Sequence, residues 1–263
     1  MKRTWYILLF ILICICTIIS FRAYHYYAPP QLQGPYKVSN HDIHDDTTRI
    51  AFIGDSWAYM HKGHNCKIAK IIESSTHRPA AVYSFGVCGL TSKEIYENIF
   101  DNKDFRHFLS KRHYEFCYVS AGINDTYKKM YTSYYQHSMD CIIQFLLYYH
   151  THPIIQEIPD YNISLSFVRQ KTSKQLLRRL SMMINDIPLD CKQIFRDALD
   201  ELISEKGYQD KVSIIRYKSW NNDYSNDLKH IYLEDGLHLN EYGYAKLDSI
   251  IAHEIIASIK KGK

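Results

Sequence analysis

Four short motifs in this chain carry residue types that a single active site could use. Gly-Asp-Ser occupies positions 54–56, Cys-Gly-Leu-Thr 88–91, Gly-Ile-Asn-Asp 122–125 and Asp-Gly-Leu-His 235–238. Together they supply a nucleophile, a base with an acid beside it, and groups that can donate hydrogen bonds to an oxyanion. This combination predicts acyl transfer through a serine, which is the chemistry of a serine esterase.

The Asp-x-x-His spacing is the most specific of these signals. A catalytic histidine needs a partner that fixes its tautomer and stabilises the imidazolium. Asp235 lies three residues before His238 and can do this within one turn, and Asn240 stands where it can cap a following helix. We predict Ser56 as the nucleophile, His238 as its base and Asp235 as the acid that orients the base.

Three groups are candidates for an oxyanion hole. The side-chain amide of Asn124 can donate a hydrogen bond, and the backbone N–H groups of Ser56 and Gly89 would complete a set of three donors. Glycine at position 89 is expected because a Cβ there would block the substrate carbonyl. The motifs also have plainer uses: Asp55 or Ser56 can cap a helix, and Asn124 can lead from a loop into one.

Short apolar runs alternate with helical patterns from position 49 onward, and they must position these motifs. The runs, which suit strands buried on both faces, lie at 50–53, 81–85, 116–120, 153–158 and 212–217. Apolar residues at helical spacing lie between or after them: Tyr135, Met139, Ile142, Ile143 and Leu146; Cys191, Ile194, Ala198, Leu199 and Leu202; and Leu247, Ile251, Ile255 and Ile259. The alternation predicts an α/β fold with a central parallel sheet and helices on both faces. The first three motifs follow the first three runs, so they are expected at the carboxyl ends of the strands. These ends lie at one edge of a parallel sheet, and ligands bind there.

All four motifs resemble the conserved blocks of the SGNH (GDSL) hydrolase superfamily, over roughly positions 49 to 258. The resemblance implies a flavodoxin-like three-layer α/β/α sandwich, the triad Ser56, His238 and Asp235, and oxyanion donors at Ser56, Gly89 and Asn124. It implies no cofactor and no metal. Trp57 stands where a leucine is common, so the pocket beside the nucleophile is expected to differ. The lack of Gly-x-Ser-x-Gly argues against the other common serine-esterase fold.

The N-terminus predicts a membrane segment. Positions 5–21 are uncharged and mostly apolar, between Lys2 and Arg3 on one side and Arg22 on the other. A cleaved signal peptide is the alternative, but positions 18–22 offer no small-residue cleavage site. We therefore expect a membrane anchor at 1–22, a linker at 23–48 and a hydrolase domain at 49–263. Lys2 and Arg3 would keep the N-terminus in the cytoplasm and place the domain outside.

Charge and cysteine usage exclude some classes of function. The net charge is +4, and six basic residues lie at the two termini, so no concentrated basic stripe suited to nucleic acid is left. Five of the seven cysteines follow the apolar segment, and this odd number leaves at least one unpaired. Cys66 with Cys88 is the candidate disulfide, and Cys117 is expected to be a buried thiol.

Two histidine-containing segments are weak candidates for metal ligands. The His/Asp cluster at 41–46 is equally typical of a solvated linker, and His61, His64 and Cys66 could lie on one polar helix face. The 23 tyrosines could line a sugar cleft or be ordinary half-buried residues. For both histidine-containing segments, an ordinary solvent-facing role is favoured over metal binding.

By analogy with membrane-tethered members of the superfamily that the chain resembles, the favoured function is hydrolysis of acyl, in particular acetyl, esters on an envelope or extracellular carbohydrate. Transfer of the acyl group to a sugar hydroxyl, as an O-acyltransferase would do, needs the same motifs, and a lipid or thioester hydrolase ranks below both. A protein of another class, an inactive membrane-tethered glycan-binding protein, is also possible. The sequence does not determine the oligomeric state. Positions 160–206 lie outside the motifs and are where we expect specificity elements.

Overall fold

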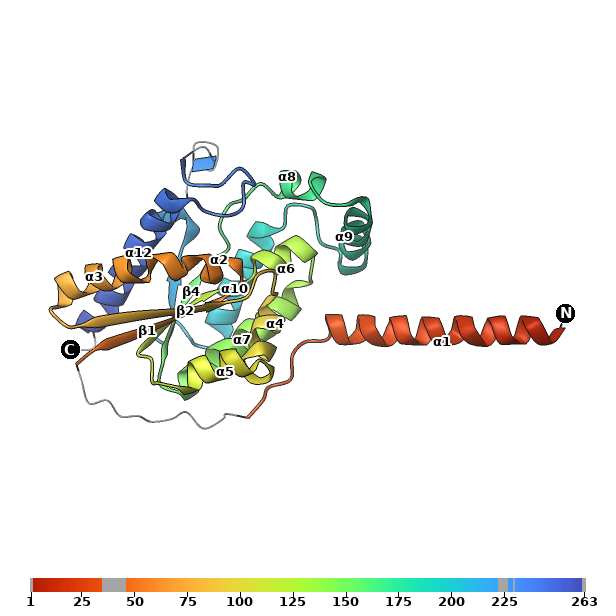
Figure 1. Cartoon of the computed structure of the whole chain (residues 1–263), viewed down its shortest axis with the longest axis horizontal. Coiled ribbons are helices and arrows are strands. Elements are labelled where there is room, and N and C mark those ends of the chain that lie inside the picture. The colour runs from red at the N-terminus through yellow and green to blue at the C-terminus, as the bar shows by residue number, and fades with distance from the viewer. Residues whose placement is uncertain (1, 35–45, 222–226, 229, 262–263) are drawn as a thin grey trace.

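A five-stranded parallel sheet with the order β2-β1-β3-β4-β5 forms the centre of the computed structural model, which describes residues 2–34, 46–221, 227–228 and 230–261 (Figure 1). The strands are β1 (Thr48–Gly54), β2 (Ala80–Gly86), β3 (Phe116–Ser120), β4 (His152–Gln156) and β5 (Ser213–Ile215). All five predicted runs contain a strand, although the last two strands are shorter than their runs. The α/β fold with a parallel sheet is therefore confirmed.

The inner strand β1 is apolar at every position of its predicted run because both of its faces are covered. β1 pairs with β2 on one side and β3 on the other, and Ile50, Ala51, Phe52 and Ile53 are completely buried. Alternating side chains of a strand point to opposite faces, so a strand that is apolar at every position needs a cover on both faces.

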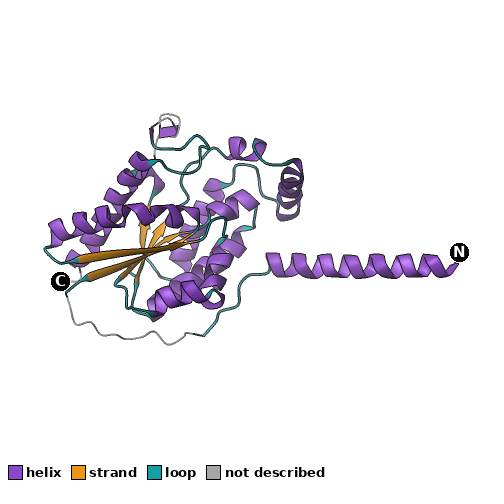
Figure 2. Ribbon diagram, viewed as in Figure 1, coloured by secondary structure: helices purple, strands orange, loops and turns teal. Residues whose placement is uncertain are grey.

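Helices cover both faces of the sheet, as Figure 2 shows. One face carries α2 (Ser56–Met60), the 3-10 turn η1 (His61–His64), α3 (Asn65–Thr76) and α12 (Glu241–Lys261), and the other carries α4 (Ser92–Asp101), α5 (Lys103–Ser110), α7 (Thr132–Tyr148) and α10 (Lys192–Glu205). The shorter α6 (Ile123–Lys128), α8 (Ile163–Val168) and η2 (Tyr217–Ser219) join these elements, and α9 (Thr172–Asn185) follows α8. The predicted three-layer sandwich is confirmed.

The predicted helical faces are nearly all buried. Every apolar residue that we assigned to α7 and α12 is in the core. In α10, Ile194 is 39% exposed and Cys191 precedes the helix as its N-cap residue. Asn240 caps α12 as expected, because the Gly243 N–H donates to its Oδ1 at 2.9 Å.

The N-terminal helix α1 (Lys2–Tyr27) extends away from the sandwich (Figure 1). Its apolar part, Trp5–Tyr27, has 23 residues; the most apolar 18-residue window within it has a mean hydropathy of 2.4, and none of that window is buried. At 1.5 Å per residue it spans about 35 Å, enough to cross a bilayer. Signal sequences share these properties. The helix continues beyond position 22, and most of the His/Asp cluster at 41–46 lies outside the described residues.

The cysteines form no disulfide. All seven lie in the described part of the chain and are free, and both Cys66 and Cys88 are exposed. The candidate Cys66–Cys88 pairing is therefore wrong. Cys117 is completely buried in β3, where burial raises the pKa of its thiol, as expected for an inert core residue.

Candidate active site

The turn between β1 and α2 presents Ser56 at the edge of the sheet. Asp55 is the N-cap residue of α2, and its Oδ1 accepts a hydrogen bond from the Trp57 N–H at 3.0 Å. Ser56 is the first residue of the helix and is half-buried. The capping role that we considered for Asp55 is therefore confirmed, and the same turn places the Ser56 hydroxyl beyond the carboxyl end of β1.

His238 connects Ser56 to Asp235. Its Nδ1 lies 2.6 Å from Asp235 Oδ2, and its Nε2 lies 3.0 Å from Ser56 Oγ. Because an ionised carboxylate can only accept hydrogen bonds, the ring proton lies on Nδ1 and Nε2 is left to accept from the serine hydroxyl. These are the contacts that a nucleophile, a base and an orienting acid require.

Asp235 is held in its ionised form by local hydrogen bonds. Partial burial of its side chain opposes ionisation, but hydrogen bonds from the His238 ring and from the backbone N–H groups of His238 and Leu237 outweigh this effect and lower the pKa of Asp235. Both N–H groups donate to Oδ1 at 2.9 Å, which leaves Oδ2 for the ring. One carboxylate therefore shapes the turn and orients the His238 ring.

The loop that carries Asp235 and His238 is held by hydrogen bonds within itself and from the segment around α8. The Leu233 N–H donates to the His238 carbonyl at 2.7 Å and closes the loop on itself. From the segment around α8, the Asn162 N–H donates to the Gly236 carbonyl at 3.1 Å, and Arg169 Nη1 donates to the Glu234 carbonyl at 3.0 Å. The segment 160–206 thus contacts the loop of Asp235 and His238 directly.

Asp55 links the first and third motifs beneath the serine. Its Oδ1 accepts from Ser120 Oγ at 3.0 Å, and its Oδ2 accepts from Asn124 Nδ2 at 3.2 Å. Burial raises the pKa of Asp55 to about 6, although hydrogen bonds from Trp57 and Ser120 partly oppose this. An amide nitrogen carries two N–H groups, so Asn124 can give one to Asp55 and offer the other to a substrate oxygen.

A second buried aspartate, Asp125, joins the third motif to the residue that follows the second. Asp125 is completely buried and accepts from Ser92 Oγ at 2.6 Å and from the Ser92 N–H at 2.9 Å. Burial raises its pKa to about 6. Ser92 begins α4 three residues after Gly89, so this contact holds the glycine turn close to Asn124. The adjacent Asn-Asp pair was the available signal, but its burial was not visible in the sequence.

Gly86, the last residue of β2, and Gly89, in the second motif, have different structural requirements. At Gly86, a Cβ would lie 2.2 Å from the Tyr59 nitrogen and 2.6 Å from the Asp55 carbonyl oxygen, so α2 packs directly on this residue. Gly89 is exposed and has a φ of +81°, and a Cβ there would meet no protein atom within 4 Å. The backbone conformation therefore demands glycine at 89, and the space beside it is open.

We expect the two glycines to respond differently to alanine. Gly86→Ala should lower the free energy of unfolding by roughly 3 kcal/mol or more, because α2 must move away from β2. Gly89→Ala should cost only about 1–2 kcal/mol, the strain of a left-handed alanine. Urea unfolding measures both, with Gly63→Ala as a control because Gly63 has open space around it and no positive φ. A Gly86→Ala variant as stable as that control would contradict the close packing.

Two expectations for neighbouring residues change. Trp57 does not shape a pocket beside the nucleophile: it is 1% exposed and packs edge-on against Trp220 and Tyr244. His61 and His64 do not lie on a solvent-facing helix surface. His61 Nε2 is 2.5 Å from Asp248 Oδ1, and His64 Nδ1 is 3.3 Å from Asp248 Oδ2, whereas Cys66 is exposed. Within the described ranges, no group of three or more potential ligands is arranged for a metal.

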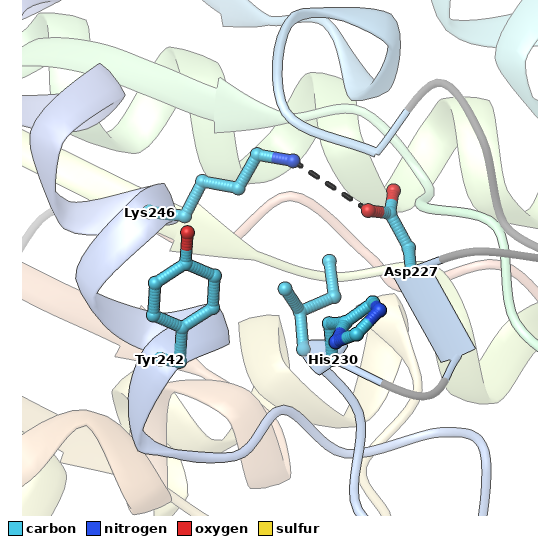
Figure 3. A pocket seen from close by; sticks show the side chains of 5 residues that line it. Asp227, His230, Tyr242 and Lys246 are labelled. Carbon is cyan, nitrogen blue, oxygen red and sulfur yellow. Dashed lines mark ion pairs between the residues drawn. The ribbon is translucent and has the colours of Figure 1, made fainter.

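A pocket of about 450 Å³ lies beside the first turns of α12 (Figure 3). It is lined by Asp227, His230, Ile231, Tyr242 and Lys246, and the Lys246 ammonium lies 3.6 Å from the Asp227 carboxylate. The Asn240 side chain donates to the His230 carbonyl at 2.8 Å and so joins this pocket to the loop. None of its lining residues belongs to the triad, so the ester chemistry is not placed there.

Comparison with known proteins supports the fold. No family model and no curated protein matches the sequence. Solved structures do match, among them a Streptococcus pneumoniae protein provisionally described as a platelet activating factor (20% identity, TM-score 0.54, 79% of this chain and 84% of that one). Another is a protein from Slackia heliotrinireducens that is provisionally described as an SGNH hydrolase (12%, 0.50, 79% and 98%). This chain has the SGNH hydrolase fold. A Geobacillus acetyl-xylooligosaccharide esterase shares it as well (13%, 0.52, 79% and 94%).

Proposed function

We propose that this chain, with its SGNH hydrolase fold, is a serine esterase. The observation that carries the proposal is the position of His238, whose two ring nitrogens contact Ser56 Oγ at 3.0 Å and Asp235 Oδ2 at 2.6 Å. The three residues come from two ends of the domain, and the Ser56–His238 contact joins positions 182 residues apart. Such an arrangement has the geometry of an activated nucleophile.

The proposed reaction proceeds through an acyl-enzyme. His238 Nε2 takes the hydroxyl proton as Ser56 Oγ attacks the ester carbonyl, and the resulting imidazolium is stabilised by the Asp235 carboxylate. The imidazolium then gives its proton to the departing alcohol oxygen as the ester bond breaks. In the second half, His238 takes a proton from water, the hydroxide oxygen attacks the acyl carbon, and Ser56 recovers its proton as the acid product leaves.

The oxyanion of each tetrahedral intermediate would be held by three donors. The backbone N–H groups of Ser56 and Gly89 and the side chain of Asn124 follow β1, β2 and β3, at the same edge of the sheet. Donors that are fixed before the reaction stabilise the developing charge without reorganising. The hydrogen bond from Asn124 to Asp55 provides this fixation for the side-chain donor.

Asn124→Ala is therefore expected to lower kcat by about 10²–10³-fold and to change KM little, because the lost hydrogen bond forms fully only in the transition state. Steady-state hydrolysis of para-nitrophenyl acetate measures this. Asn98→Ala serves as the control, since Asn98 lies on α4 and donates to the Glu94 carbonyl, away from the site. An Asn124→Ala enzyme with wild-type kcat would remove Asn124 from the oxyanion hole.

The proposed substrate is an acylated, in particular acetylated, carbohydrate of the cell envelope or extracellular space. The fold shared with an acetyl-xylooligosaccharide esterase supports this choice, as does the apolar helix α1. With Lys2 and Arg3 retained in the cytoplasm, α1 would anchor the chain and leave the catalytic domain on the other side. N-terminal sequencing of the protein from the membrane fraction tests whether the segment is cleaved.

One experiment separates the esterase from its alternatives. The full chain in detergent is given para-nitrophenyl acetate, with and without acetyl-free xylooligosaccharide as an acceptor. Hydrolysis without the acceptor supports the esterase. Release of para-nitrophenol only when the acceptor is present indicates an O-acyltransferase, which uses the same acyl-enzyme. A folded chain that binds the oligosaccharide, with no turnover in either condition, indicates an inactive glycan-binding protein.

A further inference from the structure

The helix α9 exposes apolar side chains and buries a charged one, the reverse of an ordinary surface helix. Five of its side chains are large, apolar and between 44% and 80% exposed: Leu176, Leu177, Leu180, Met183 and Ile184. Arg178, in contrast, is 5% exposed. A helix that packs its apolar stripe on its own domain shows the opposite arrangement. The apolar face of α9 therefore requires a cover from outside the domain.

The inner side of α9 is already occupied. The Arg178 guanidinium lies over the Tyr127 ring at 4.0 Å from its centroid and 5.2 Å from that of Phe167. Ser181, also buried, lies 2.9 Å from the Tyr27 hydroxyl through its Oγ. These polar contacts fix which face points inward, so a small rotation cannot bury the leucines.

The charge around α9 has one sign. Between Asp160 and Asp186 the chain contains five basic residues and no acidic one; the basic residues are Arg169, Lys171, Lys174, Arg178 and Arg179. All of them except Arg178 are exposed. An exposed apolar stripe beside basic side chains is typical of helices that lie in the interface of an anionic membrane.

The end of α1 is attached beside α9. In addition to the contact of Tyr27 with Ser181, Lys93 Nζ donates to the carbonyls of His25 at 2.6 Å and Ala28 at 2.7 Å, and the Tyr131 hydroxyl donates to the Tyr27 carbonyl. In Figure 1, α9 stands next to the point where α1 leaves the domain, and it runs across the direction of α1. If α1 crosses a bilayer, α9 lies along the surface of that bilayer.

We propose that α9 is a second membrane contact, with its apolar face inserted at the surface of an anionic bilayer. The inference rests on the membrane anchoring in the proposed function. A pocket of about 510 Å³ at the C-terminal end of the helix, lined by Met182, Met183, Ile187 and Pro188 among others, extends the apolar surface. Through Asn162 and Arg169, the same segment is hydrogen-bonded to the loop of Asp235 and His238. The contact therefore holds the catalytic loop at a set orientation to the bilayer.

The test places a tryptophan on the apolar face of α9 in the full chain. Trp57 and Trp220 are buried, and Trp5→Phe removes the tryptophan of α1. On this background, Leu177→Trp reports on α9, and Tyr242→Trp at the start of α12 is the matched control, because both original side chains are large and more than 60% exposed. Each chain is reconstituted in nanodiscs of phosphatidylcholine and phosphatidylglycerol with or without bromine on the acyl chains.

Brominated lipid should reduce the additional emission of Leu177→Trp about twofold or more and that of Tyr242→Trp hardly at all, since an interfacial helix inserts roughly 5–10 Å into the headgroup and acyl boundary. Combining Lys174→Glu and Arg179→Glu should reduce this quenching, whereas Lys70→Glu with Lys211→Glu should not. Equal, weak quenching at both reporter positions in chains that enter the discs would overturn the proposal and leave the anchor standing.

The remaining outcomes also decide between explanations. If a second copy of the chain covered the apolar face of α9, the tryptophan of Leu177→Trp would be shielded from the bromines. Each disc would then hold two chains even when the protein is highly diluted before reconstitution. Chains that do not enter the discs would refute both the anchor and the contact of α9. Hydrolysis of para-nitrophenyl acetate by the same samples tests the esterase separately, because that reaction does not require α9 to touch lipid.

Discussion

Ser56→Ala is expected to abolish ester hydrolysis, with a loss in kcat on the order of 10⁶-fold. The substitution removes the oxygen that forms the acyl-enzyme and leaves His238 without a hydroxyl to deprotonate. The other parts of the site, including the three oxyanion donors, stay in place, so binding of the ester should change little. Steady-state hydrolysis of para-nitrophenyl acetate, supplemented by labelling with a fluorophosphonate, measures the effect.

The control for this prediction is Ser74→Ala. Ser74 lies on α3 and its hydroxyl only donates to the Ile71 carbonyl, so its loss should leave activity and labelling intact. Ser56 is half-buried and, among the described residues, its hydroxyl hydrogen-bonds to His238 alone, so both variants should unfold within a few degrees of the wild type. Hydrolysis by a folded Ser56→Ala variant at more than a tenth of the wild-type rate would disprove the nucleophile assignment.

Asp235→Asn should reduce kcat about 10⁴-fold. Asparagine has the shape of aspartate and keeps one oxygen, which can still accept the N–H groups of Leu237 and His238. Its amide nitrogen, however, would face His238 Nδ1 and donate to it, so the ring proton would move to Nε2. His238 could then no longer accept the proton of Ser56, and no carboxylate would stabilise an imidazolium.

Glu234→Gln is the matched control, since Glu234 is an exposed carboxylate that directly precedes Asp235 in the chain. That variant should retain nearly full activity. If the two substitutions reduced kcat equally, the effect of position 235 would be one of net charge, and the role of Asp235 as the orienting acid would be refuted. Thermal unfolding of both variants checks that the loop remains folded.

The sequence predicted the sheet because the relevant signals are local. Ile50 to Ile53 are apolar at every position, which only a strand covered on both faces requires. The carboxyl ends of parallel strands lie at one edge, so the three motifs that follow β1, β2 and β3 had to meet there. Asp235 and His238 are also a local pair, three residues apart, and their contact could be anticipated from spacing alone.

Contacts between distant residues were not predictable in this way. The hydrogen bonds between Asp125 and Ser92 join two motifs, yet in the sequence Asp125 is only an aspartate at the start of a helix. The burial of Trp57, and the sharing of Asp248 by His61 and His64, depend on how α12 packs against the turn after β1. The pairing of Cys66 with Cys88 failed for the same reason: proximity to one edge does not bring two thiols together.

The types of the reactive residues, the parallel sheet that carries them and the apolar N-terminal helix follow from local sequence patterns. The distance between Ser56 and His238 arises only when the chain folds, because the two residues lie 182 positions apart. The outward direction of the leucines of α9 is likewise a property of the folded domain. The spacing of apolar residues along a helix defines a face but not what that face contacts, and in α9 the polar contacts of Arg178 and Ser181 settle the direction.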